Sequence, residues 1–296
     1  MELRDIEIFL TLAGELHFGR TAERLHVSAA RVSQAIKKQE RGIGAELFHR
    51  DSRNVRLTPA GVRLRDDLIP VYRDLKASME RARLTARGKT DVLRIGLLSG
   101  NAQDLRPITD EFTARHPGYE PQFRTIGFGD PFGPLRDGRV HVAILWLPIL
   151  EPDLTVGPLV YTESAVLAMA ATHRLAGRAS VSLEDLGDEI VMGGCKPDYW
   201  REALVPFQTP SGRLIRIGPI VTNTEEMLPI LSTGEAVSPG HYRSIRYFTR
   251  PDIAYALIHD APPLQMTLIW HTSAENEVIR AFAEVIRDLG PLPARH

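Results

Sequence analysis

Residues 20–40, RTAERLHVSAARVSQAIKKQE, decide the fold of the first part of this chain. Apolar side chains at positions 22 and 25 mark the buried side of a short helix. Val32, Ala35 and Ile36 then give a second helix its inward face. Ser28 stands between the two, where its hydroxyl can cap the second helix. Two short helices joined by so tight a turn predict a helix-turn-helix.

The outward positions of the second helix suit a surface that reads DNA. They are small near the helix start, which allows close approach to the major groove, and carry long donors farther on. We expect Arg31, Ser33 and Gln34 to contact base edges, while the helix start and the lysines suit phosphate. The spacing alone leaves an alternative open, the exposed face of a helical bundle. The predicted residues are Ser28, Ala29, Ala30, Arg31, Ser33, Gln34, Lys37 and Lys38.

Residues 46–61, ELFHRDSRNVRLTPAG, continue the same domain. A Leu-Phe pair points into the core, and three arginines follow on a short polar hairpin that has the form of a wing. Such arginines straddle a DNA backbone or enter the minor groove. A solvated surface hairpin is the alternative. We predict DNA contacts from Arg50, Arg53 and Arg56.

The segment before the helix-turn-helix and the charge balance agree with this interpretation. Residues 3–16 place apolar side chains, beginning with Leu3 and Ile6, on the expected buried face of a first helix. Residues 1–90 hold 18 Lys and Arg against 12 Asp and Glu, a balance of +6. The remainder holds 18 against 25, a balance of −7. A basic first third indicates contact with a polyanion.

A long helix is predicted after the hairpin, because Thr58 and Pro59 form a strong helix start. Apolar side chains recur at intervals of three and four through residues 64–86, a narrow stripe suited to pairing with a second copy. Pro70 lies inside this pattern and is expected to kink or interrupt the helix. Gly88 is expected to end it. A long helix packed on its own domain is the alternative to dimerisation.

The chain of 296 residues is longer than one compact core usually serves. Its 43% hydrophobic and 25% charged residues are typical of globular domains. No apolar run approaches the roughly 18 residues of a membrane span, and the first residues are too charged for a signal peptide. The single cysteine, Cys195, forms no internal disulfide and suits a reducing compartment. We therefore expect a cytoplasmic protein without membrane contact.

From residue 91 on, strand-like and helix-like segments alternate, as a parallel α/β sheet requires. A second lobe is expected to begin near residue 164, and the chain is expected to return to the first lobe near residue 267. The predicted domains are 1–58, DNA-binding; 59–90, linker and dimerisation helix; and 91–296, effector-binding, with lobe 1 at about 91–163 and 267–296 and lobe 2 at about 164–266.

Four segments of the first domain, AERLHVS, VSQAIKKQE, LFHR and VRLTPAG, together resemble the DNA-binding head of the LysR-type transcriptional regulators. The resemblance rests on their order: helix-turn-helix, Leu-Phe pair with arginine, then a Leu-Thr-x-x-Gly helix start. Ala29 and Ala30 replace a common Gln-Pro, and Gln39 replaces a usual leucine. HRLAGRASVSLEDL, residues 173–186, extends the likeness to the effector domain of the same family.

The resemblance implies a fold class and partners. The fold is α/β, with an N-terminal winged helix-turn-helix, a long linker helix and a bilobal effector domain like periplasmic binding proteins. The partners are double-stranded promoter DNA, a small-molecule effector such as a carboxylate in the cleft between the lobes, and RNA polymerase. A second copy completes a homodimer or a homotetramer. A regulator that binds DNA without sensing a ligand is the alternative.

In open α/β lobes, ligands gather at the carboxyl ends of strands, here facing the cleft. Residues 99–101 follow the first strand at a helix start, which is a natural seat for a carboxylate. Residues 222–224 offer the same geometry in the second lobe. For every candidate, a plain cap, turn or packing residue is the alternative. The predicted effector-binding residues are Ser99, Gly100, Asn101, Gly127, Phe128, Trp146, Gly194, Thr222, Asn223, Thr224 and His241.

Catalytic motifs are missing from the sequence. HExxH, GxGxxG, GxxxxGK[ST] and GxSxG do not occur. We therefore expect no catalysis, no cofactor and no metal site, and an enzyme built on the bilobal domain is the least favoured alternative. Cys195 has no second cysteine to resolve an oxidised form, so an incidental thiol is favoured over a redox sensor.

Overall fold

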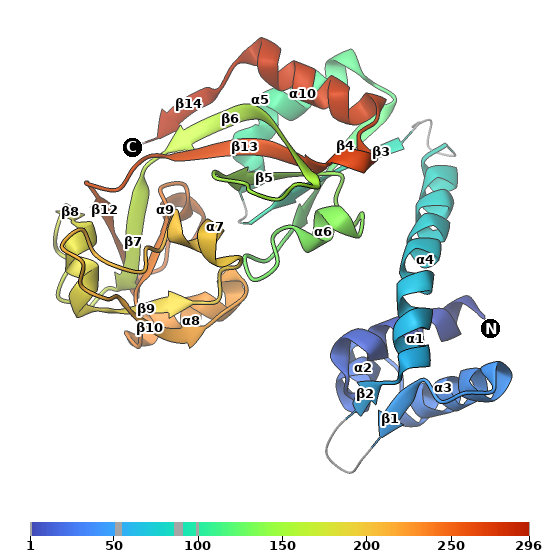
Figure 1. The fold of residues 1–296 in the computed structure, drawn as a ribbon. Helices are drawn as coiled ribbons and strands as arrows, with labels where there is room; N and C mark the ends of the chain where they lie inside the picture. Colours follow the sequence, from blue (N-terminus) through green and yellow to red (C-terminus); the bar gives the residue numbers. More distant parts are fainter. Residues whose placement is uncertain (1, 51–54, 86–90, 99–100, 296) are drawn as a thin grey trace. The chain divides into compact units, whose positions relative to one another are not determined.

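The computed structural model of the chain describes residues 2–50, 55–85, 91–98 and 101–295. It divides into two compact units, Met1–Arg83 and Leu84–His296 (Figure 1). Each unit has a hydrophobic core of its own. No helix within the described ranges is both long and apolar enough to cross a membrane.

The first unit contains the predicted helix-turn-helix. The chain leaves α2 at His26, whose left-handed backbone conformation (φ 52°) turns it sharply, and the N–H of Val27 donates to Ala22 O at 2.9 Å. Ser28 caps the next helix, since its Oγ accepts from the N–H of Arg31 at 3.2 Å. The elements are α1 (Leu3–Glu15), α2 (Phe18–Leu25), α3 (Ala29–Ile43), β1 (Phe48–Arg50) and β2 (Val55–Leu57).

The three helices and the β1–β2 hairpin enclose one small core. Phe9 of α1 and Phe48 of β1 meet edge to face with ring centroids 5.6 Å apart. The expected buried face of α1 is partly wrong, because Leu3 is 38% exposed whereas Asp5 is completely buried. β1 and β2 pair antiparallel, as a wing requires. Other core side chains come from all three helices: Ile8, Leu12, Ala22, Val32, Ala35 and Ile36.

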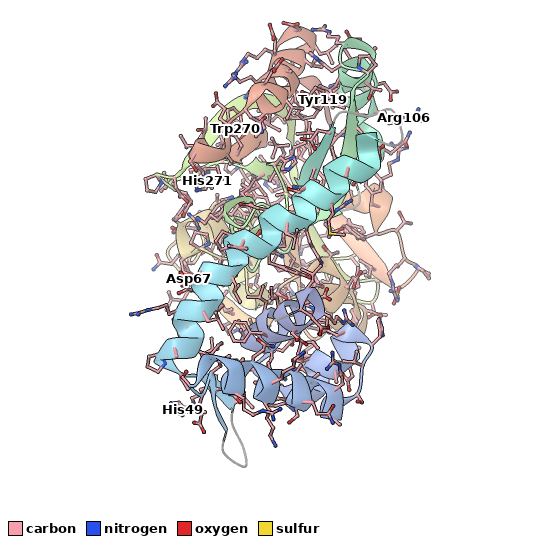
Figure 2. The ribbon with its side chains drawn as sticks, turned by 90° about the vertical axis from the view of Figure 1, so that its right-hand side faces the viewer. His49, Asp67, Arg106, Tyr119, Trp270 and His271 are labelled. Carbon is pink, nitrogen blue, oxygen red and sulfur yellow. The ribbon has the colours of Figure 1, made fainter. Side chains whose placement is uncertain are left out.

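The long helix α4 (Pro59–Thr85) begins where the sequence predicts. Thr58 Oγ1 accepts from the N–H of Gly61 at 3.0 Å and donates to Glu46 O at 2.7 Å, which fixes the helix start to the wing. Gly61 has to be glycine, because a Cβ there would lie 2.1 Å from Leu47 O. Pro70 lies inside α4, which continues as one helix (Figure 2), so of the expected kink or interruption the interruption is wrong. The expected stop at Gly88 lies outside the described residues.

The second unit is built on two main sheets, as the bilobal prediction requires. A six-stranded sheet has the order β14-β6-β13-β5-β3-β4, and a four-stranded sheet has the order β11-β7-β12-β8. The expectation of a parallel sheet is wrong in part. β13 runs antiparallel to both of its neighbours, so the sheet of lobe 1 is mixed. A small parallel sheet, β9 with β10, completes lobe 2.

The chain crosses between the two sheets twice. The first crossing is at Ser164, between β6 and β7, and the second leads from β12 to β13. β13 starts at Leu264, slightly before the expected return. The strands are β3 (Asp91–Leu97), β4 (Tyr119–Thr125), β5 (Val142–Trp146), β6 (Leu154–Glu163), β7 (Ala165–Ala170), β8 (Ser180–Val181), β9 (Ile190–Gly193), β10 (Arg216–Ile220), β11 (Ser238–His241), β12 (Ile253–Ile258), β13 (Leu264–His271) and β14 (Leu292–Arg295).

Helices cover the sheets and position the loops between the lobes. α5 and α10 lie side by side on the six-stranded sheet, where Phe112 and Phe282 pack edge to face (Figure 1). α10 shows a clean apolar face, and Asn276 caps it by accepting from the N–H of Ile279. The helical segments are η1 (Asn101–Leu105), α5 (Arg106–Arg115), α6 (Gly133–Arg136), η2 (Leu183–Asp188), α7 (Asp198–Glu202), α8 (Thr224–Thr233), α9 (Ser244–Tyr247), η3 (Thr272–Ala274) and α10 (Glu277–Leu289).

Candidate functional site

The outer face of α3 carries the residues predicted to read DNA. Val32, Ala35 and Ile36 are fully buried, so the residues between them point outward. Ser33 is half-buried, and the other predicted members of this face are exposed: Ser28, Ala29, Ala30, Arg31, Gln34, Lys37 and Lys38. The helix therefore presents a small, polar start followed by cations, which is the shape that a major groove admits.

A buried carboxylate lies behind this face. Asp5 of α1 is fully buried, and its two oxygens lie 3.6 Å from Arg31 Nη2 and 3.4 Å from Lys38 Nζ. Glu2, through a hydrogen bond, and Asp5 raise the pKa of Lys38. Gln39 Nε2 donates to Asp5 O at 2.8 Å, again from a buried position. Two of the predicted DNA contacts are thus oriented by one acid, which the sequence pattern did not reveal.

The wing is described only in part. Arg56 on β2 is exposed and available to a ligand. Arg50 ends β1, but its side chain lies outside the described residues, as does all of Arg53. The hairpin register, in which Arg50 pairs with Val55, fixes the base of the wing.

The second unit has a partly open cavity of about 80 Å³ between its lobes. Its walls are mostly apolar, with a polar edge at Ser238, His241 and Ser244, all contributed by β11 and α9. Ligand pockets usually measure about 300 to 1,000 Å³, so this one admits only a small molecule unless the lobes part. The lining residues are Leu98, Phe128, Trp146, Met192, Gly193, Cys195, Leu204, Val205, Val221, Thr224, Met227, Ser238, Pro239, Gly240, His241, Ser244 and Phe248.

Four of the predicted effector residues line this cavity: Phe128, Trp146, Thr224 and His241. Ser99 and Gly100 lie outside the described residues, as does the side chain of Asn101, whose backbone opens η1. The remaining glycines let backbones approach each other closely. A Cβ on Gly127 would lie 2.7 Å from Thr222 O, and one on Gly194 (φ 111°) would lie 1.8 Å from Val221 O.

The carboxylate seat expected at Thr222 is already filled by the chain itself. The backbone N–H and the Oγ1 hydroxyl of Thr222 both donate to Glu226 Oε2, at 2.7 Å and 2.9 Å. These hydrogen bonds hold the pKa of Glu226 below its ordinary value. Asn223 is a plain helix cap, because its Oδ1 accepts from the N–H of Glu226 at 3.0 Å. Only Thr224 of the three reaches the cavity.

Two tryptophans join the lobes beside the cavity. Trp146, at the end of β5, stacks on Trp200 of α7 with ring centroids 3.8 Å apart and planes within 5°. Each indole N–H donates to the backbone carbonyl of the other residue, at 3.1 Å and 2.9 Å. Trp200 therefore belongs to the core of lobe 1 although α7 follows a strand of lobe 2. The wall that Trp146 forms is held by both lobes.

A group of buried charges lies behind the polar edge of the cavity. Glu163, at the end of β6, is fully buried, and its Oε1 lies 3.4 Å from His241 Nδ1. The backbone N–H of Arg243 donates to Glu163 Oε2 at 2.8 Å. The Arg243 guanidinium pairs with Asp104 of η1 at 2.9 Å and stacks on Tyr161. Sequence reasoning missed all of these residues except His241, because isolated charges indicate a solvated surface.

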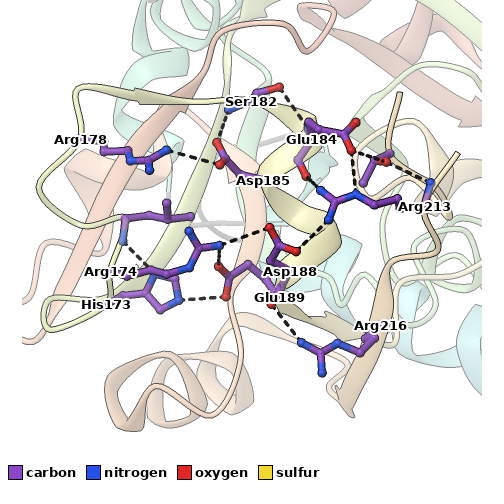
Figure 3. Close-up of polar contacts among 12 residues, drawn as sticks. His173, Arg174, Arg178, Ser182, Glu184, Asp185, Asp188, Glu189, Arg213 and Arg216 are labelled. Carbon is purple, nitrogen blue, oxygen red and sulfur yellow. Dashed lines mark hydrogen bonds and ion pairs between the residues drawn. The ribbon is translucent and has the colours of Figure 1, made fainter. Parts of the chain in front are cut away.

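A second charge network lies on the outside of lobe 2 (Figure 3). Glu189 accepts from His173 Nε2 at 3.0 Å and pairs with Arg174, while Arg213 bridges Glu184 and Asp188 at 2.8 Å each. Most of these side chains are substantially exposed, where such pairs contribute little to stability. The network ties η2 and Glu189 to the neighbouring segments that carry His173, Arg174 and Arg213. Its charges are therefore already paired with one another.

The single cysteine is a wall of the cavity. Cys195 follows β9 and is half-buried, and burial raises the pKa of its thiol to about 12. A thiol of this kind is inert at neutral pH, because the thiolate is the reactive form. Within the described residues there is no group of three His, Cys, Asp or Glu side chains placed to hold a metal ion.

Comparison with known proteins divides the chain in the same way. Residues 3–62 match the family model "Bacterial regulatory helix-turn-helix protein, lysR family", and residues 86–291 match "LysR substrate binding domain". The transcriptional regulator AlsR of Bacillus subtilis strain 168 is 32% identical over 70% of this chain and 68% of its own length. TfdS of Cupriavidus pinatubonensis is 28% identical over 97% of this chain and 98% of its own.

Solved structures show a similar fold. The crystal structure of CbnR, described as a LysR family transcriptional regulator, has a TM-score of 0.66 at 21% identity and covers 97% of this chain and 99% of that one. A second structure, of full-length CbnR complexed with its target DNA, has a TM-score of 0.63 at 22% identity. It covers 98% of this chain and all of the other.

Proposed function

This chain belongs to the LysR family of DNA-binding, effector-modulated transcription regulators, and on this premise we propose how its residues divide the work. The outer face of α3 enters the major groove of promoter DNA, and the wing holds the adjacent backbone. The exposed, cation-bearing face of α3 carries the proposal, because its residues point away from the core of the first unit. CbnR, which shares the fold, is described in complex with its target DNA.

The contacts fall into two classes. Arg31, Ser33 and Gln34 lie in the first two turns of α3 and read base edges. Lys37, Lys38 and the capped helix start at Ser28 bind phosphate, as do the wing arginines. Asp5 holds Arg31 in place for its base contact. The face comprises Ser28, Ala29, Ala30, Arg31, Ser33, Gln34, Lys37 and Lys38 on α3 and Arg50, Arg53 and Arg56 on the wing.

The second unit senses a small molecule in the cavity between its lobes. Phe128, Trp146, Thr224 and His241 contact this effector. Two copies pair through the apolar stripe of α4, where Val71, Leu75 and Met79 are more than 40% exposed. Effector binding changes the closure of the lobes and thereby the activity of the dimer at a promoter. The similar proteins are named transcriptional regulators, which supports a cytoplasmic binding role without catalysis.

Footprinting on the promoter region beside the protein's own gene tests this function. The wild type is expected to protect a two-fold symmetric site. Arg31→Ala and Gln34→Ala should relax base preference, at a cost of about 1–3 kcal/mol for the preferred site. Lys37→Ala should weaken all sequences alike and reduce the slope of log affinity against log salt by about 0.9.

Arg106→Ala is the matched control, since Arg106 is an exposed arginine of the second unit. It should leave binding unchanged. Uniform effects from all three α3 variants would refute the division into base and phosphate contacts. Absence of protection at any salt concentration would refute the proposed function itself.

A further inference from the structure

We infer that Arg243 is a peg that fastens lobe 2 to lobe 1 and holds the two lobes of the second unit in one arrangement. Its backbone lies in lobe 2, between β11 and α9. Among the described residues, the partners of its guanidinium all belong to lobe 1. This role goes beyond the proposed function, because it concerns how the lobes are held whichever molecule occupies the cavity.

The guanidinium of Arg243 contacts three separate elements of lobe 1. Its Nη1 lies 2.9 Å from Asp104 Oδ2 of η1, and its Nη2 donates to Pro293 O of β14 at 3.4 Å. On β6, the guanidinium stacks over the Tyr161 ring at 4.0 Å from the centroid, and Nε lies 4.0 Å from Glu163 Oε2. These three elements are distant from one another in the sequence, so one side chain joins lobe 2 to several parts of lobe 1.

The peg begins where the chain passes from one lobe to the other. Glu163 is the last residue of β6, and β7 of the other sheet begins after one further residue (Figure 1). The N–H of Tyr242 donates to Ser164 O at 3.0 Å. The N–H of Arg243 donates to Glu163 Oε2 at 2.8 Å. The backbone of the peg is therefore fixed to the crossing itself, while its tip reaches Asp104 in a different part of lobe 1.

Burial makes this contact costly to break. The side chains of Arg243 and Asp104 are only 2% and 3% exposed, and that of Glu163 is fully buried. Water screens such charges little, and separation of a buried pair leaves each charge without compensation. A rotation of the lobes has to draw the guanidinium out of this enclosure. Arg246 of α9 also reaches Asp104, at 3.3 Å, but it is 57% exposed and returns to water easily.

Other contacts between the lobes are uncharged. The N–H of Lys196 donates to Phe128 O at 3.0 Å. A neutral hydrogen bond of this kind contributes little net free energy, because water replaces either partner once it breaks. The stack of Trp146 on Trp200 adds apolar contact without charge. The ion pair of Arg243 is thus the contact that tolerates separation of the lobes least.

Distances between spin labels on the two lobes test this role in the full-length protein. Because the chain has one cysteine, Cys195→Ala gives a background in which new labels are placed. Glu284→Cys on α10 and Glu225→Cys on α8 are suitable sites, since both side chains are exposed and lie in different lobes. Dilution with excess unlabelled protein keeps the measured distances within one chain. With the peg intact, double electron–electron resonance should give one narrow distance distribution.

Variants of the peg should add a second distance. Arg243→Gln and Asp104→Asn should each raise the population of a parted arrangement by about tenfold or more, because a buried ion pair is lost. The double variant should go no further than either single one, since both remove the same contact. Arg250→Gln is the matched control, because Arg250 pairs with Asp252 at 3.1 Å within lobe 2. It should leave the distribution unchanged.

Asp104→Asn leaves Arg243 and Glu163 as a balanced pair of charges, so it keeps the test open if Arg243→Gln does not fold. An unchanged distribution in a folded peg variant overturns the inference. So does equal broadening by Arg250→Gln, additive broadening in the double variant, or two distances in the wild type. Footprinting of the same proteins separates the two claims. Unchanged distances with intact DNA protection overturn this inference alone, whereas absence of protection by the wild type refutes the proposed function.

Discussion

Two carboxylates, Asp5 in the first unit and Glu163 in the second, are both fully buried and both lie against the side chains of two basic residues. The difference is in the partners. Arg31 and Lys38 keep about half of their surface in solvent, whereas His241 and Arg243 are enclosed. Under the proposed function, the same arrangement serves two kinds of ligand: DNA at the exposed face of α3, and a small molecule in the cavity of the second unit.

The comparison of Asp5 with Glu163 predicts that removal of each acid lowers the free energy of unfolding by a different amount. Glu163→Ala leaves Arg243 and His241 buried without their shared carboxylate, and should lower the free energy of unfolding by about 3–5 kcal/mol. Urea denaturation monitored by tryptophan fluorescence measures this, because all three tryptophans lie in the second unit. Glu235→Ala, at an exposed acid, is the control and should stay within about 0.5 kcal/mol of the wild type. An equally small effect of Glu163→Ala would remove the basis for the comparison.

His141, a half-buried histidine of the second unit, offers a contrast to His241. His141 accepts from the N–H of Arg94 at 3.3 Å, and burial and Arg94 lower its pKa from 6.5 to about 4, against the opposing effect of Asp91. The unfolded chain thus binds a proton below about pH 6.5 that the folded protein refuses until about pH 4. Stability should fall across this window as the pH drops, by up to about 3 kcal/mol.

Urea denaturation at a series of pH values measures this loss. His141→Gln should flatten the dependence between pH 6.5 and pH 4. The same slope in the variant would assign the loss to other groups.

Removal of Asp5 in the first unit should lower the free energy of unfolding by less than removal of Glu163. Asp5→Ala frees Arg31 and Lys38, but both can return to water, so the expected loss is about 1–2 kcal/mol of unfolding free energy. In DNA-binding assays the variant should discriminate less between sequences, because Arg31 loses its orientation, while non-specific binding rises with the added positive charge. Circular dichroism of the helical first unit follows its unfolding. A loss as large as that of Glu163→Ala would show that exposure of the partners does not matter.

The smallest change in stability is expected at Gln39, which contacts Asp5. Gln39 is buried, and its Oε1 has no hydrogen-bond partner within the described part of the chain, although its Nε2 donates to Asp5 O. Gln39→Leu removes an unsatisfied acceptor and adds an apolar contact, so stability should stay level or rise by up to about 1 kcal/mol. A decrease beyond about 1 kcal/mol would mean that the amide is needed to hold Asp5 in place.

These acids also mark the limit of what the sequence predicts. Caps such as Ser28 and Thr58, and the apolar spacing of α3, are local signals, and the structure confirms them. Asp5 and Glu163 carry no such signal, because an acidic residue in a short window is typical of a solvated surface. Their burial results from side chains that are distant in the sequence.

The cavity was predictable in part for the same reason. Phe128, Trp146 and Thr224 follow or end secondary-structure elements where α/β proteins bind ligands, so topology alone was enough. Thr222 does not line the cavity, and its donors are used by Glu226 four residues on. The wall from β11 to Phe248 depends on the antiparallel pairing of β11 with β7, which the expected parallel sheet did not include.

The stacking of Trp146 on Trp200 has a spectroscopic consequence. Two of the three indoles of the chain form one nearly parallel pair in the core of lobe 1, and Trp146 also borders the cavity. Parallel chromophores at 3.8 Å couple their electronic transitions, so the pair absorbs and emits as one unit with its own near-ultraviolet dichroism. A molecule that contacts Trp146 in the cavity changes the surroundings of this pair directly. The pair is thus an optical probe of the cavity, which can be read without a label while a small molecule is added.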